Sequence, residues 1–83
     1  MTIQTLKNFI SANPKILSGK PVFHGTRIPV HSVLELLASG VSSKEIISDD
    51  YYPSLSLKHI QAALEYSSRL FRNEEVHSFA SAS

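Results

Sequence analysis

The chain has 83 residues, a net charge of +1 at pH 7 and no cysteine. A chain of this length forms one domain and buries only roughly 60–65% of its unfolded surface, so we expect self-association to stabilise it. The lack of cysteine excludes disulfides and thiolate chemistry, and no apolar run reaches the ~18 residues of a membrane span. The near-neutral charge neither favours nor excludes nucleic acid, so a DNA-binding face requires local clustering of cations.

The N-terminus lacks a basic region followed by an apolar core, so no secretion signal is predicted and the cytoplasm is the expected location. Ile3, Leu6, Phe9 and Ile10 recur at roughly helical spacing, which suggests a short N-terminal helix, but residues 9–11 fit a strand equally well, so the structure of residues 1–8 is left open. From Phe9 onward we expect an extended β arm that continues to residue 29.

The arm contains the most distinctive stretch, residues 19–30, with two glycines, two prolines and a run of β-favouring residues. Val22 and Phe23 are expected to form a short strand, with a second extended piece at Ile28. The prolines disfavour helix at the residues before them and bracket this segment. Gly25 lies between the two pieces, where a turn requires positive φ or close backbone approach.

Three helices are predicted after the arm, in a bundle that spans residues 30–72. The first covers about 30–39, where apolar residues recur at i, i+3, i+4 and i+7, and Gly40 is expected to end it. The second begins with a capping box in which Ser42 caps Glu45, and it ends near residue 49. Residues 73–83 are small and polar, so a flexible tail is expected.

The third helix is the longest, from Ser56 to about Arg72. One stripe of this helix comprises Leu57, Ile60, Ala63, Leu64, Ser67 and Phe71. The opposite side comprises Lys58, Gln61, Ala62, Glu65, Arg69 and Arg72. Two short helices joined by a glycine turn and followed by a longer helix are typical of three-helix DNA-binding bundles.

The stretch GKPVFHGTRIPV, followed by VLELLASG, a Ser-x-x-Glu helix start and a Tyr-Pro turn, resembles domain-of-unknown-function family four-thirty-three. The family pattern is Gly-x-Pro-x-x-x-Gly-Thr-Arg-x-x-Val, and the resemblance runs from about Ile10 to Tyr66. It implies a mainly α fold: a homeodomain-like (helix-turn-helix) three-helix bundle with a short N-terminal β arm, usually a homodimer. Family members are treated as VapB-like antitoxins, often encoded beside a PIN-like ribonuclease toxin.

Catalysis is not predicted, and neither is a metal or cofactor. The four histidines show no metal-ligand spacing: they are His24, His31, His59 and His77. No serine lies in a nucleophile elbow, and the glycines form no phosphate-cradling loop.

The predicted DNA-binding residues all lie on the third helix: Lys58, His59, Gln61, Arg69 and Arg72. Cations at Lys58 and His59 oppose the helix dipole at a cost of a few tenths of a kcal/mol, and family members often carry acidic residues there. This departure is either neutral on a solvated surface or marks an anion, such as a DNA phosphate, at the helix start. Gln61 is placed to reach an adenine edge, whereas Glu65 opposes wide phosphate contact.

The predicted partner- or dimer-binding residues lie on the arm: Phe23, His24, Thr26 and Arg27. Arg27 either pairs with a carboxylate or carbonyl that holds the arm, or contacts a phosphate or an acidic partner surface. A second departure from the family is a turn before Pro53 that is about one residue longer. Tyr51 and Tyr52 in that turn are expected to close the core rather than to stack on bases.

The leading functional hypothesis is an antitoxin-like regulator that binds operator DNA and neutralises a PIN-like ribonuclease toxin. The alternative is a dimeric protein–protein adaptor that binds no DNA. Either way we expect a homodimer formed partly through residues 9–30, because an extended arm has unpaired edges.

Overall fold

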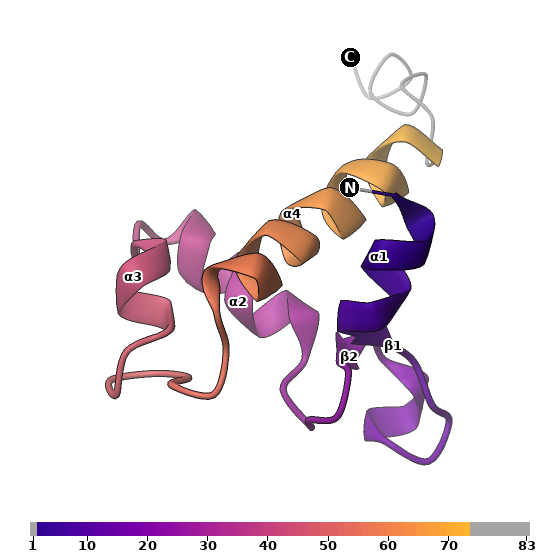
Figure 1. Ribbon diagram of the computed structural model, residues 1–83, viewed down its shortest axis with the longest axis horizontal. Coiled ribbons are helices and arrows are strands. Elements are labelled where there is room, and N and C mark those ends of the chain that lie inside the picture. The colour runs from indigo at the N-terminus through magenta and orange to yellow at the C-terminus, as the bar shows by residue number, and fades with distance from the viewer. Residues whose placement is uncertain (1, 74–83) are drawn as a thin grey trace.

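The computed structural model describes residues 2–73. These residues form four α-helices, a short 3-10 helix and a two-stranded sheet, in the order α1 (Ile3–Phe9), β1 (Ile10–Ser11), η1 (Leu17–Gly19), β2 (Val22–Phe23), α2 (Val30–Ala38), α3 (Ser43–Ile46) and α4 (Leu57–Asn73). The long helix α4 crosses the molecule, and α1, α2 and α3 all pack against it (Figure 1). The predicted mainly helical fold with a small β element is confirmed, and α2, α3 and α4 lie where three helices were expected; a fourth helix precedes the β element.

The additional helix is α1, which resolves the two alternatives left open for residues 1–8. Thr2 caps it, because the Thr2 hydroxyl oxygen accepts a hydrogen bond from the Thr5 N–H at 3.1 Å. Leu6 is buried in the common core, so α1 is held by packing on α4 rather than by helix propensity. The extended arm accordingly starts at Ile10, one residue later than expected.

The arm folds into a minimal sheet in which β1 and β2 are antiparallel, with Ile10 opposite Phe23 and Ser11 opposite Val22. The second extended piece returns beside β2, because the Phe23 N–H donates to the Ile28 carbonyl at 3.0 Å. Gly25 in the intervening turn has φ +79°, so the predicted positive φ is confirmed.

Helix α2 ends in a Schellman motif, as the glycine signal predicts. Gly40 has φ +98°, and the Val41 N–H donates to the Leu36 carbonyl at 3.0 Å. Helix α3 is only four residues long, and the Ser42 hydroxyl accepts from the Glu45 N–H at 3.2 Å. This is one of the two hydrogen bonds of the predicted capping box. In place of the second, to the Ser42 backbone N–H, the Glu45 carboxylate lies 3.5 Å from the Ser42 hydroxyl.

The core lies between α4 and the other elements. Its buried side chains include Leu6, Phe23, Val30, Val33, Ile46, Leu55, Ile60, Ala62 and Ala63. Ala62 is wholly buried although the sequence pattern placed it on the opposite side of α4 from Ile60 and Ala63. Of the two tyrosines before Pro53, Tyr52 packs on the core and Tyr51 is exposed.

Helix α4 continues through Asn73, and residues 74–83 of the expected tail lie outside the described residues. Within residues 2–73, no helix is both long enough and apolar enough to cross a bilayer.

Candidate functional site

The Gly25 turn is held by the side chain of Thr26. The Thr26 hydroxyl donates to the Phe23 carbonyl at 2.7 Å and accepts from the Ile28 N–H at 3.0 Å. A Cβ at Gly25 would meet no atom within 4 Å, so this glycine is required by its positive φ and not by lack of space. Thr26 therefore maintains the turn through its hydroxyl group.

The same turn exposes His24 and Arg27 to solvent. Within residues 2–73, no hydrogen bond or ion pair engages either side chain, so the structure does not show the carboxylate or carbonyl contact considered for Arg27. Phe23, by contrast, is 0% exposed and belongs to the core. Its assignment to a partner-binding surface is therefore corrected: the turn presents His24 and Arg27.

His59 lies at the start of α4, and its ring faces Phe9 and Phe23. Its Nδ1 accepts two hydrogen bonds from Ser56, one from the backbone N–H at 3.0 Å and one from the hydroxyl at 2.9 Å. Its ring makes edge contacts with Phe9 at 5.1 Å and Phe23 at 5.6 Å between centroids. His59 thus occupies the helix position where a capping-box glutamate reaches back to the N-cap N–H.

Burial lowers the pKa of His59 below its ordinary value of 6.5. The neutral ring is the form that accepts from Ser56, because a protonated imidazole has no lone pair at Nδ1. The structure therefore assigns His59 a capping role through Nδ1, and its contact with DNA stays a prediction.

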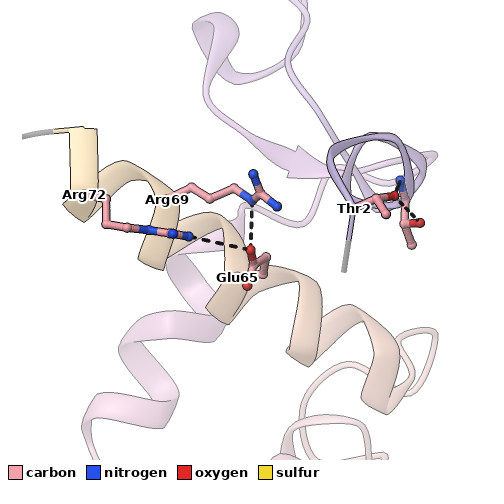
Figure 2. Close-up of polar contacts among 5 residues, drawn as sticks. Thr2, Glu65, Arg69 and Arg72 are labelled. Atoms are coloured by element: carbon pink, nitrogen blue, oxygen red, sulfur yellow. Dashed lines mark hydrogen bonds and ion pairs between the residues drawn. The ribbon is translucent and has the colours of Figure 1, made fainter.

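Two further residues of the predicted DNA-binding set are engaged by one carboxylate. The Arg69 Nε donates to Glu65 Oε1 at 2.8 Å, and an Arg72 nitrogen lies 4.0 Å from the same oxygen. Figure 2 shows both arginines converging on Glu65 from the same side of α4. Glu65 therefore cancels part of the positive field that these arginines would offer to a phosphate.

Lys58 and Gln61 are the two predicted DNA-binding residues that remain exposed on the first turns of α4. No hydrogen bond or ion pair engages either side chain in the described part of the chain. The structure thus does not bring the five residues together into a single basic surface.

The outer face of α4 carries a line of exposed apolar residues that sequence reasoning did not single out. Leu57, Leu64 and Phe71 are 52%, 51% and 52% exposed, although they were assigned to the same stripe as the buried Ile60 and Ala63. They recur every seven residues, so they lie along one line on the helix. We call these three residues the outer stripe; their heptad spacing was the signal that could have identified it.

A groove of about 550 Å³ lies between α1 and the C-terminal half of α4. Its apolar lining comprises Ile3, Leu6, Ile10, Tyr66 and Leu70, and its basic lining comprises Lys7, Arg69 and Arg72. Figure 1 shows the two helices lying beside each other at this end of the molecule. We call this feature the α1–α4 groove; the sequence did not predict it, because a helix was only one of the alternatives for the N-terminal residues.

No group of three or more histidine, aspartate or glutamate side chains within residues 2–73 is arranged to hold an ion. The described residues present four surface features: the turn, the start of α4, the outer stripe and the α1–α4 groove.

Comparison with known proteins identifies relatives of this chain. It is 35% identical over 60 residues to the uncharacterized protein y4eO of Sinorhizobium fredii, a match that spans 72% of this chain but only 26% of that relative. Its fold resembles the crystal structure of a DUF433 member protein from Anabaena variabilis, with a TM-score of 0.69 and 30% identity, over 81% of this chain and 64% of the other. Residues 10–67 match the model of the family described as protein of unknown function (DUF433). The chain therefore belongs to the DUF433 family.

Proposed function

We propose that this protein is a dimeric protein-binding adaptor whose two copies associate through the outer stripe of α4. The observation that supports this proposal is the exposure of Leu57 and Leu64 at heptad spacing on a helix of 17 residues. Apolar side chains repeated every seven residues form the seam by which one helix packs against another. The stripe is about 21 Å long at 1.5 Å per residue, from Leu57 to Phe71.

The polar residues between the apolar ones fit the same seam. If Leu57, Leu64 and Phe71 take the d positions of a heptad, Gln61 and Ser68 take the a positions. Polar a residues lower the stability of a helix pair and restrict its register. The spacing is symmetric about Leu64, so a two-fold antiparallel pair places Leu64 against Leu64 of the second copy and Leu57 against its Phe71.

The size of the stripe sets the strength of this association. Only about half of each of the three side chains is exposed, so the stripe offers a small apolar area. We therefore expect a dimer that dissociates on dilution and not an obligate one.

Sedimentation of the full chain over a concentration series tests this proposal. The wild type is expected to shift from monomer to dimer as the concentration rises through the micromolar range, and Leu64→Lys is expected to stay monomeric. Leu17→Lys is the matched control, since Leu17 is an exposed leucine outside α4. A wild type that remains monomeric at several hundred micromolar would overturn the proposal.

An antitoxin-like regulator is the second candidate, supported by Lys58 and Gln61 at the start of α4. On this hypothesis α2, α3 and α4 act as a homeodomain-like helix-turn-helix unit, α4 docks on operator DNA, and the adaptor surfaces hold a PIN-like toxin. Fluorescence anisotropy on the protein's own upstream DNA, at low and moderate salt, tests it. Salt-dependent binding that Lys58→Ala weakens would support this candidate, and no binding at low salt would eliminate it.

A further inference from the structure

We infer that the α1–α4 groove binds an acidic, apolar peptide segment of a partner protein. This inference deepens the proposed adaptor function by naming the class of partner. It does not depend on the dimer, because the groove is formed by α1 and α4 of a single chain.

The floor of the groove offers apolar contact area. Ile3 is 54% exposed and Leu70 is 45% exposed, while Leu6 beneath them is buried in the core. Ile3 and Leu70 are held by separate helices, so their separation is fixed by the packing of α1 on α4. The groove volume lies within the ~300–1,000 Å³ that is typical of ligand sites, which is enough for a few side chains of a peptide.

The sides of the groove determine the charge of its partner. Lys7 comes from α1, whereas Arg69 and Arg72 come from α4, and none of the described lining residues is acidic. Among residues 2–73, Glu65 pairs with both arginines and does not itself line the groove. The Arg72 side chain is 67% exposed, and its contact with Glu65 is long, at 4.0 Å. Lys7 makes no ion pair among residues 2–73.

A cationic rim around an apolar floor selects a partner with the complementary pattern. Carboxylates pair with the rim and give specificity and faster association, while leucine or phenylalanine side chains fill the floor. A nucleic acid backbone would satisfy the rim but leave Ile3 and Leu70 exposed. An amphipathic peptide that carries both groups satisfies the whole groove, in the manner of helix-in-groove recognition.

Binding of a defined probe tests this inference. The probe is a fluorescein-labelled helical peptide of about fifteen residues with glutamates on one face and leucines on the other, a length that spans roughly 22 Å. We expect saturable binding to the full chain that weakens as salt rises. The same peptide with lysine in place of glutamate is expected not to bind.

Variants locate the binding to the groove. Lys7→Glu is expected to weaken binding at least tenfold and Lys7→Arg to preserve it, whereas Lys15→Glu, an exposed charge change of the same sign in the loop after β1, is expected to have little effect. Leu70→Ser is expected to weaken binding of the probe at high salt as well, since it removes apolar contact. Far-ultraviolet circular dichroism establishes that each variant is folded.

Four outcomes would overturn the inference. These are the absence of saturable binding, equal binding of the lysine peptide, equal loss of affinity in Lys15→Glu, and displacement of the probe by duplex DNA at equal charge. Leu64→Lys separates the two proposals, since it is expected to abolish the dimer and leave peptide binding intact.

Discussion

Ser56 donates two hydrogen bonds to one atom of His59, the backbone N–H at 3.0 Å and the hydroxyl at 2.9 Å from Nδ1. This pair closes the start of α4, and the ring behind it rests on the edges of Phe9 and Phe23. A histidine in this position connects the cap of one helix with the end of α1 and with the β arm. It also makes the cap sensitive to protonation.

We predict that acid destabilises the protein through His59. Burial lowers the pKa of His59 in the folded chain, so the unfolded chain binds more protons as the pH falls through 6.5 and below. The stabilisation is fully present above the unfolded value and is lost at lower pH. Urea unfolding at pH 7.5 and 5.5 measures it, and we expect a loss on the order of one hydrogen bond, about 1 kcal/mol.

The matched variants for that experiment are His59→Gln and His24→Gln. A glutamine at residue 59 retains an acceptor for Ser56 but does not titrate, so its stability is expected to change less with pH. His24 is exposed on the turn, and its replacement is expected to leave the pH dependence as it is. An equal pH dependence in wild type and His59→Gln would contradict the prediction.

We predict that Gly25→Val destabilises the fold more than Arg27→Ala does. A β-branched residue at φ +79° costs roughly 1–3 kcal/mol in backbone strain, whereas nothing nearby would collide with the new side chain. Arg27 is exposed and makes no hydrogen bond or ion pair within the described residues, so its truncation is expected to cost under about 0.5 kcal/mol. Thermal melts rank the two variants, and the reverse order would refute the prediction.

We predict that Thr26→Val destabilises the turn while Thr26→Ser does not. Valine removes the hydroxyl that donates to the Phe23 carbonyl and accepts from the Ile28 N–H. Leaving these partly buried groups without a partner costs about 1–3 kcal/mol, and serine restores both hydrogen bonds. Chemical denaturation compares the variants; similar stability of valine and serine would show that the methyl group, not the hydroxyl, holds the turn.

We predict that a single cysteine at residue 64 cross-links two copies. The chain has no cysteine of its own, so Leu64→Cys introduces the only thiol. In an antiparallel pair centred on residue 64, we expect the Cα atoms of the two cysteines to lie within the roughly 4.4–6.8 Å that a disulfide requires. Mild oxidation followed by non-reducing electrophoresis reports the dimer, and Lys44→Cys on α3 is the control that should remain monomeric.

The features that could be predicted from sequence are set by a few neighbouring residues. Gly25, Gly40 and Ser42 each act through their own turn, so their roles follow from local backbone chemistry. Helix α1 could not be assigned in the same way, because the packing of Leu6 on α4 stabilises it. The contact that selects the helix is made with α4, so the sequence of residues 1–8 alone does not determine their conformation.

The face of α4 was misjudged for a related reason. The predicted stripe grouped Leu57 and Leu64 with Ala63, but Ala62 and Ala63 are wholly buried while Leu57 and Leu64 are half exposed. Small residues on the inner face let neighbouring elements approach α4 closely, and the larger side chains then lie outside. Among the five predicted DNA-binding residues, His59 contacts Phe9 of α1, whereas the arginines pair with Glu65 on α4 itself.

The α1–α4 groove is made from the first and the last helix that the structure describes, with most of the chain between them. During synthesis Leu70 and Arg72 emerge long after Ile3, so the groove cannot form before α4 has been made. A ligand of the groove would therefore recognise chains that contain both α1 and α4 and discriminate against fragments that lack either helix. At a ligand concentration one hundred times its dissociation constant, binding would also stabilise the folded chain by ~2.7 kcal/mol. The population of unfolded chains would fall roughly a hundredfold, so the protein would survive longer in the presence of proteases.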